Sequence, residues 1–402
     1  MPSPEPCTNP PCDSMVVPKD TFMVWQIPML PDFTYGFSAT PLIIDDKLIF
    51  TNRLVVQGEP INAVNKSTGE LLWRNENSLT ISSSSVPFYY SGNKLAFLQN
   101  YQLSTWNIDT GNKIWGINFR EFPNGNSFSN LSGFGNLLFT STLPYNADKK
   151  STIINLVKID MDNQQIDTLY SLTTVDGYTP DIEPPGVTIN IIGDTLLLFQ
   201  CRLYNFPKGD GRIDFYCFNM TQKKLEWKNE DIEESGIGAI YTPQILGDKV
   251  YYQGSNEVFM FDIATGNKIW SRRFLGESYY FTKNLIVGDK IFVKDDGYRF
   301  KALDVNTGNT IWETDPDKKY GGGLGPAYVD GNVFIMGTDS GSYGAIFGLR
   351  ASTGKQFWQY RTPNYKKYSS STFGYINMIA DPETGYLYTG DGVFMMCLKP
   401  PK

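Results

Sequence analysis

Apolar and polar residues follow one another in short blocks along this chain, and the blocks recur in pairs joined by tight turns. The clearest pair is 258–270, VFMFDIATGNKIW, in which an apolar run, a turn with Asp262 and Gly266, and a second run close on Trp270. Bulky apolar side chains suit a pleated, half-buried strand. Asp can hydrogen-bond its own backbone in a turn, and Gly accepts a positive φ cheaply. The segment is therefore predicted to be a β-hairpin that ends on a large aromatic residue.

This hairpin pattern recurs along the chain, and in each copy the closing residue stands eight positions after the residue that opens the turn. The closing tryptophans are Trp73, Trp115, Trp227, Trp270, Trp312 and Trp358. A degenerate copy at 155–168, NLVKIDMDNQQIDT, has Thr168 at the closing position. Closing positions lie 42 to 59 residues apart, and most separations are in the forties. A period of this length indicates a repeat architecture.

A second kind of hairpin alternates with the first. It has an apolar run, a short polar turn of the Gly-Asp or Gly-Asn kind, and another apolar run, as in 242–252 (TPQILGDKVYY) and 283–293 (KNLIVGDKIFV). Two hairpins give four antiparallel strands for each repeat. Four strands in about forty residues are typical of one blade of a β-propeller.

The two ends of the chain are predicted to complete one blade together. The segment after Trp358 has three strand-like runs (376–400), whereas 21–28, TFMVWQIP, is a single strand that carries Trp25. A strand taken from the N-terminus would close the ring and leave no free sheet edge. We therefore predict an all-β, eight-bladed propeller of four-stranded antiparallel blades over residues 19–402. Residues 1–18, rich in Pro, are predicted to be a flexible leader.

Composition narrows the classes of function. The chain has 402 residues, 41% of them hydrophobic, a net charge of −7 and no histidine. The acidic balance and the lack of a Lys/Arg run predict no nucleic-acid partner, and no apolar stretch is long enough to span a membrane. Without histidine, Ser-His-Asp catalysis and histidine-ligated zinc or haem are excluded. No cofactor and no metal are expected.

Five cysteines are too few for a disulfide framework. Cys7 and Cys12 bracket a short turn and could close a small loop. Cys201 and Cys217 flank a predicted hairpin loop and could pair across it. The alternative is that all five cysteines are free thiols, and the sequence leaves both possibilities open.

The recurring Thr-Gly-x-x-x-Trp motif resembles that of the β-propellers built from pyrroloquinoline-quinone-type repeats. The motif stands at Thr68-Gly69 to Trp73, and again before Trp115, Trp270, Trp312 and Trp358. The resemblance covers roughly residues 20–400. It implies that the blade tryptophans, Trp25 and Trp227 included, dock between neighbouring blades and are structural.

Two functional classes share these repeats. In quinoprotein dehydrogenases the propeller holds the quinone and calcium, but no catalytic Asp or calcium-ligand set of that class can be matched here. The other class consists of non-catalytic scaffolds. Within it, this chain is similar to the BamB family, an outer-membrane assembly lipoprotein that binds the barrel-inserting protein BamA. The resemblance implies a monomeric, non-enzymatic scaffold of the bacterial envelope, periplasmic or outer-membrane-associated. Its partner would be an outer-membrane protein or assembly machinery, and its one membrane contact a lipid anchor. The alternatives are a quinoprotein-like enzyme and a glycan- or small-molecule-binding propeller.

The predicted binding face is the one with long, irregular connections, because variable loops on a rigid scaffold commonly carry binding. These connections are 76–87, 117–130, 203–211, 274–282, 315–326 and 360–375. Aromatic residues and Arg are typical interface anchors. The candidate partner-binding residues are Phe122, Tyr204, Arg272, Tyr279, Tyr280, Tyr320, Tyr365 and Tyr368. The glycine run 321–323 and the acidic segments 209–211, 295–297 and 390–392 are interpreted as loops and turns and not as phosphate or calcium sites.

Overall fold

In a computed structural model, the described part of the chain is all-β and forms eight sheets. The described residues are 21–29, 40–51, 59–79, 88–99, 102–118, 126–127, 131–144, 153–173, 178–205, 210–233, 242–254, 257–274, 284–294, 299–314, 325–338, 344–366, 373 and 377–402. The predicted leader, Cys7, Cys12, the glycine run 321–323 and the segment 295–297 lie outside them. No helix in the described ranges is long and apolar enough to cross a membrane.

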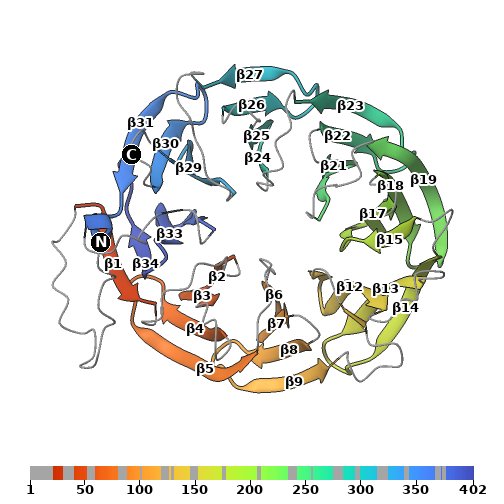
Figure 1. The fold of residues 1–402 in the computed structure, drawn as a ribbon, viewed down its shortest axis with the longest axis horizontal. Coiled ribbons are helices and arrows are strands. Elements are labelled where there is room, and N and C mark those ends of the chain that lie inside the picture. Colours follow the sequence, from red (N-terminus) through yellow and green to blue (C-terminus); the bar gives the residue numbers. More distant parts are fainter. Residues whose placement is uncertain are drawn as a thin grey trace. The chain divides into compact units, whose positions relative to one another are not determined.

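Each of the first four sheets is built from consecutive strands of the chain (Figure 1). Blade 1 contains β2 (Leu42–Ile44), β3 (Lys47–Thr51), β4 (Glu59–Asn65) and β5 (Leu71–Leu79). Blade 2 contains β6 (Phe88–Ser91), β7 (Lys94–Gln99), β8 (Gln102–Asn107) and β9 (Lys113–Asn118). Blade 3 contains β10 (Asn126–Ser127), β11 (Ser132–Phe134), β12 (Leu137–Pro144), β13 (Ile153–Asp160) and β14 (Ile166–Thr173). Blade 4 contains β15 (Thr179–Ile182), β16 (Gly186–Ile189), β17 (Thr195–Asn205), β18 (Asp210–Asn219) and β19 (Lys224–Glu233).

The remaining sheets have the same antiparallel order. Blade 5 contains β20 (Gln244–Leu246), β21 (Lys249–Gln253), β22 (Glu257–Asp262) and β23 (Lys268–Arg273). Blade 6 contains β24 (Leu285–Val287), β25 (Lys290–Lys294), β26 (Phe300–Asp304) and β27 (Thr310–Glu313). Blade 7 contains β28 (Ala327–Val329), β29 (Asn332–Thr338), β30 (Gly344–Arg350) and β31 (Gln356–Arg361), followed by the 3₁₀ helix η3 (Pro363–Lys366). Blade 8 contains β32 (Ile379–Asp381), β33 (Tyr386–Gly390), β34 (Phe394–Leu398) and β1 (Met23–Pro28).

The predicted eight-bladed propeller and its closure by the N-terminal strand are confirmed. β1 pairs antiparallel with β34, with Trp25 opposite Cys397 and Pro28 opposite Phe394. Backbone hydrogen bonds from Lys399 N to Phe22 O (2.7 Å) and from Met29 N to Val393 O (2.8 Å) extend the pairing at both ends. Blade 8 therefore joins the first described strand to the last three.

Four of the blade tryptophans, Trp25, Trp227, Trp270 and Trp312, lie against the turn glycine of a following blade. Trp25 donates its indole N–H to Lys66 O (2.9 Å), and Trp312 does the same to Ala351 O (2.9 Å). The turn glycine lies directly under the ring: a Cβ on Gly354 would be 2.4 Å from Trp312 Cε3. Because Gly354 also has a φ of 70°, this position favours glycine on two counts.

Contacts divide the chain into two compact units. One comprises residues 1–85, 282–305 and 310–402, and its cores join blade 6 to 7, blade 7 to 8 and blade 8 to 1. The other comprises residues 86–281 and 306–309, and its cores join blade 3 to 4 and blade 4 to 5. In both units, successive side chains of an inner strand point to opposite faces of its sheet. Alternate residues therefore pack against the neighbouring sheet.

The disulfide that the sequence allowed between Cys201 and Cys217 is absent, and both are buried free thiols. Cys201 lies opposite Asp214, whereas Cys217 lies opposite Leu198. Cys201 belongs to the core shared with blade 3, and Cys217 belongs to the core shared with blade 5. The two thiols therefore point to opposite faces of one sheet and cannot meet.

Candidate functional site

The predicted partner-binding residues fall at the ends of blades, mostly beyond the described part of the chain. Phe122, Tyr279, Tyr280, Tyr320 and Tyr368 lie outside the described residues, as does the side chain of Tyr365 at η3. Tyr204 is half-buried near the end of β17, opposite Thr179 and Gly211. Arg272 is exposed on β23, opposite Val258. These two residues lie on blades 4 and 5, so the described part of the predicted site is the loop end of those blades.

Blade 4 has unusually long strands. β17 has 11 residues and β18 and β19 have 10 each, whereas the corresponding strands of blade 5 have five or six. A further strand, β15, pairs with the extended half of β17. The extension places charged side chains on both faces of the sheet, beyond the apolar cores.

One face carries a network centred on the fully buried carboxylate of Asp214. It accepts hydrogen bonds from Lys228 Nζ (3.0 Å) and from the Asp231 amide (3.0 Å), and Tyr216 OH lies 3.4 Å away. Burial alone would lower the pKa of Lys228, but its bonds to Glu230 and Asp214 outweigh burial and raise it. The ammonium therefore stays charged at neutral pH and compensates the buried carboxylate.

The opposite face carries a second network. Arg202 pairs with Asp181 and with the fully buried Glu183, whose Oε1 is 2.8 Å from Nη2. Burial alone would lower the pKa of Arg202, but the charges of Asp181 and Glu183 raise it. Tyr252 of blade 5 is fully buried nearby, and burial together with the charge of Glu233 raises the pKa of its phenol. Two ionic networks therefore brace the loop end of blade 4.

A groove lies beside the bulge in β19 and the first network. The register shifts opposite Asp214, and Asp231 takes a φ of 52° within the strand. The groove has a volume of about 720 Å³ and is lined by residues 228–232, Phe261 and residues 266–268. Asn229 Nδ2 donates to Gly266 O across it (2.7 Å). The groove combines both signs of charge with backbone and amide groups, which suits a polar peptide segment better than an apolar ligand.

The described cysteine thiols are poorly suited to nucleophilic catalysis. Burial raises the pKa of Cys217 and of Cys397 to about 12, and raises that of Cys201 further. Such thiols stay protonated at neutral pH and are weak nucleophiles. Within the described ranges, no three His, Cys, Asp or Glu side chains are arranged to hold a metal ion.

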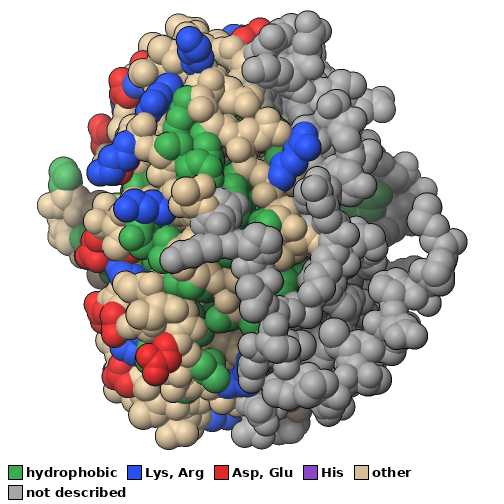
Figure 2. Space-filling view, turned by 90° about the vertical axis from the view of Figure 1, so that its left-hand side faces the viewer, with side chains coloured by type: hydrophobic (Ala, Val, Ile, Leu, Met, Phe, Trp, Pro, Cys, Tyr) green, Lys and Arg blue, Asp and Glu red, His purple; other side chains and the backbone are tan. Residues whose placement is uncertain are grey.

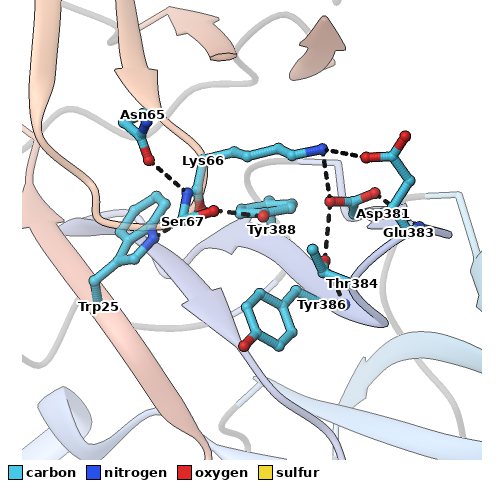
Figure 3. A network of polar contacts seen from close by, with 9 residues as sticks. All are labelled: Trp25, Asn65, Lys66, Ser67, Asp381, Glu383, Thr384, Tyr386 and Tyr388. Carbon is cyan, nitrogen blue, oxygen red and sulfur yellow. Dashed lines mark hydrogen bonds and ion pairs between the residues drawn. The ribbon is translucent and has the colours of Figure 1, made fainter. Parts of the chain in front are cut away.

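A separate polar network joins blade 1 to blade 8 (Figure 3). Lys66 Nζ is 3.0 Å from both Asp381 and Glu383. The carbonyl of Lys66 accepts hydrogen bonds from Trp25 Nε1 (2.9 Å) and Tyr388 OH (3.1 Å). One residue of the blade 1 turn thus contacts three segments of blade 8, so this network is a structural clamp on the closing blade.

Sequence reasoning missed an apolar turn at the other end of blade 4. The second kind of hairpin predicts a short polar turn for the connection between β16 and β17. The connection instead exposes Ile191 and Ile192, whose side chains are 104% and 71% accessible. The signal is present in the sequence, because the connection within 188–195 (TINIIGDT) is longer than the two-residue turns of most other blades.

Comparison with known proteins identifies the family. The sequence pattern of the family described as "Outer membrane protein assembly factor BamB" matches residues 24–180 and 210–380. A crystal structure of BamB from Moraxella catarrhalis has a TM-score of 0.58 at 14% identity, over 93% of this chain and 96% of that one.

Quinoproteins are similar as well. Quinohemoprotein alcohol dehydrogenase ADH IIB of Pseudomonas putida is 31% identical over 133 residues, which is 26% of this chain and 19% of that protein. A europium-containing methanol dehydrogenase has a TM-score of 0.66 at 10% identity, covering 91% of this chain and 84% of that one. At this identity the structural likeness concerns the fold alone. Because the family pattern matches far more than half of the chain, this protein belongs to the family of the outer membrane protein assembly factor BamB.

Proposed function

We propose that this protein is a non-catalytic scaffold of the bacterial cell envelope that binds a partner protein through the long-connection end of its blades. The observation that carries the proposal is the family match over residues 24–180 and 210–380. The dehydrogenase match, by contrast, covers only 19% of that enzyme. The partner is an outer-membrane protein or a component of its assembly machinery, and the leader holds the propeller at a membrane through a lipid anchor.

Surface chemistry supports a protein partner. Figure 2 shows apolar, basic and acidic side chains interspersed over the described part of one face, where neither sign of charge dominates. Such a mixture is typical of protein-binding surfaces, whereas nucleic-acid binding favours a continuous basic patch. The braced loop end of blade 4 supplies a rigid base for the connections above it.

The test is affinity purification of the full chain from its native envelope. Tyr279→Ala/Tyr280→Ala removes two aromatic candidates from one long connection, and Tyr90→Ala, on an exposed tyrosine of β6, is the matched control. We expect a stoichiometric partner with the wild type and the control. Recovery should fall at least about tenfold in the double variant, the loss expected for interface anchors. Equal recovery with all three proteins would contradict binding at this end.

A quinone-dependent enzyme is the second candidate, favoured by the 31% identity to the dehydrogenase of Pseudomonas putida. That activity would require the chain to hold pyrroloquinoline quinone with calcium. The two candidates differ in an observable that needs no partner, namely cofactor binding by the purified protein.

A further inference from the structure

The connection that leads from blade 7 into blade 8 is held at its beginning by a buried carboxylate. Asp391, in the turn between β33 and β34, is fully buried and accepts hydrogen bonds from Thr362 Oγ1 (2.5 Å) and Asn364 Nδ2 (3.0 Å). Its other oxygen accepts the amides of Val393 (3.0 Å) and Phe394 (2.8 Å), which fixes the orientation of the carboxylate. The first residues of the connection are therefore tied to blade 8.

The end of the same connection is held by the core between blades 7 and 8. Phe373 and Met378 are both buried and belong to that core. Because their side chains are removed from water, the segments that carry them leave the core only at a large cost in free energy. The described residues of this connection are thus anchored before and after the part that contains the candidate Tyr368.

Asn377, next to this core, joins the connection to both neighbouring blades. Its Oδ1 accepts a hydrogen bond from Gly325 N (3.4 Å), and its Nδ2 donates one to Thr40 Oγ1 (2.6 Å). The three residues hold equivalent places, because each stands two positions before the first strand of its blade, which is β28 for Gly325, β32 for Asn377 and β2 for Thr40. One amide side chain therefore links the connections that enter blades 7, 8 and 1.

Asn377 has the geometry of a link between connections. A side-chain amide can accept and donate at once, and here the half-buried amide does both toward groups of two other connections. The linked residues all belong to one compact unit, in which apolar cores join blade 7 to 8 and blade 8 to 1. The polar links at the long-connection end therefore add to the apolar contacts of the same three blades.

The linked connections carry three of the eight candidate partner-binding residues. Tyr320 belongs to 315–326, and Tyr365 and Tyr368 belong to 360–375. A surface whose parts are held in place before binding loses less conformational entropy when a partner docks. Links among three adjacent connections therefore favour one broad surface, of the kind that a folded protein domain covers, over separate sites for short peptides.

We propose that Asn377 is a positioning residue for partner binding, which holds the connections into blades 7, 8 and 1 as one preformed surface for a folded protein domain. This inference rests on the proposed function and adds to it the sector of the long-connection end that binds the partner. Asn377 acts on the arrangement of the connections and not through contact with the partner. Its loss therefore reduces the fraction of molecules that are ready to bind.

The experiment compares Asn377→Ala, Asn377→Asp, Thr40→Val and Asn112→Ala in the full chain, with urea unfolding to verify that each variant is folded. Asn377→Ala removes both links, whereas an aspartate can still accept from Gly325 N and from the Thr40 hydroxyl. Thr40→Val is the milder variant and removes one link. Asn112→Ala, at an exposed position in a turn of blade 2, is the matched control.

Two quantities are measured for each variant. The first is hydrogen exchange at Gly325 N in the protein alone. The second is the pair of association and dissociation rates with the partner that affinity purification of the wild type recovers. The first quantity reports on the link itself, and the second reports on its role in binding.

We expect exchange at Gly325 N to become about three to ten times faster in Asn377→Ala, since the amide loses its acceptor. The association rate should fall about tenfold with the dissociation rate changed less than about twofold, because fewer molecules are ready to bind but the bound state is the same. Asn377→Asp should restore most of the association rate, and Thr40→Val should give an intermediate value. Adding Thr40→Val to Asn377→Ala should have no further effect, since both act through one link.

Four results would overturn the proposal: unchanged exchange at Gly325 N in Asn377→Ala, an unchanged association rate, an effect confined to the dissociation rate, which marks a direct contact, or an equal effect of Asn112→Ala. Recovery of no partner by the wild type would overturn the proposed function and, with it, the binding role of Asn377. A partner whose binding rates do not depend on Asn377 would contradict this inference alone, so the two failures are distinguishable.

Discussion

At the scale of single residues, the propeller depends on close contact between an aromatic ring and a glycine of another blade. Trp25, Trp227, Trp270 and Trp312 each lie over a turn glycine with a positive φ. The indole N–H of Trp25, Trp227 and Trp312 donates to a carbonyl of the same turn, which for Trp227 is Ile263 O (2.8 Å). The Thr-Gly-x-x-x-Trp motif is therefore a packing motif. Its Thr and Gly shape the turn, and its Trp covers the turn of a different blade.

Gly354→Ala tests this packing. Both this substitution and the control, Gly288→Ala, place a side chain at a positive φ, with a strain of about 1–2 kcal/mol. Nothing lies within 4 Å of a Cβ on Gly288, whereas one on Gly354 would overlap Trp312. We expect Gly354→Ala to lower the free energy of unfolding by about a further 1–3 kcal/mol, the usual range for overpacking. Equal losses in urea denaturation would contradict the proposed contact.

Lys66→Met tests the clamp on the closing blade. Asp381 is almost fully buried, and removing one partner of a buried ion pair typically costs about 3–5 kcal/mol. Lys290→Met breaks the exposed pair with Asp289 and should cost less than about 1 kcal/mol. The measurement is the free energy of unfolding at neutral pH. A loss no larger than that of the control would show that the clamp contributes little.

The clamp also predicts a dependence on pH. Burial tends to raise the pKa of Asp381, but its bonds to Lys66 and to backbone amides lower it overall. Its contribution is thus present above about pH 3.9, the unfolded value, and is lost as pH falls through the lower folded pKa. Burial tends to lower the pKa of Lys66, but Glu383 and Asp381 raise it. The contribution of Lys66 is thus present below about pH 10.4 and is lost as pH rises through the raised folded pKa.

The stability difference between wild type and Lys66→Met should therefore be constant between about pH 5 and pH 9 and shrink outside that range. Urea unfolding across the pH range measures it. A difference that varies through neutral pH would point to another titrating group and contradict this assignment.

At the scale of elements, strand β1 is the piece on which closure depends. It pairs with β34 along its length and places Trp25 in the core between blades 8 and 1. Deleting residues 1–29 removes this strand and leaves an unpaired edge, which favours association. We expect a chain that unfolds at lower urea and elutes as larger species in size-exclusion chromatography. Deleting residues 1–20 keeps β1 and should change neither measurement.

The bulge of β19 is the second element whose shape depends on one side chain. Asp214→Ala removes the acceptor of the Asp231 amide and the partner of Lys228. Hydrogen exchange at the Asp231 amide should become at least about tenfold faster, since leaving a buried donor unpaired costs about 1–3 kcal/mol. Glu230→Ala removes only an exposed partner of Lys228 and is the control. Unchanged exchange in Asp214→Ala would show that the strand itself imposes the bulge.

These elements also show where sequence reasoning works and where it fails. Hairpins such as 258–270 were predictable because alternation, turn residues and Trp spacing are all local. The same spacing identifies Thr168 as the position where this copy lacks its tryptophan, and Thr168 lies on β14 opposite Val157. The bulge at Asp231 depends on a carboxylate of another strand, so no local pattern marks it. The turn at 190–194 was misinterpreted because its isoleucines continue an apolar run that resembles a strand.

At the scale of the whole molecule, the family pattern covers most of an eight-bladed propeller, and in blade 4 it leaves out residues 181–209, which hold β16 and β17. The long strands β17 to β19, the two ionic networks and the apolar turn all belong to that blade. A repeat fold tolerates such an addition because each blade contacts mainly its neighbours.

Titration of the purified full chain with pyrroloquinoline quinone and calcium tests the central claim most directly. Quinone binding is followed by fluorescence quenching, and dye reduction is then assayed with an alcohol as substrate. The scaffold account predicts no saturable binding and no turnover above a protein-free control. Saturable, calcium-dependent binding with alcohol-dependent dye reduction would contradict it and would assign the chain to the quinone enzymes that share its fold.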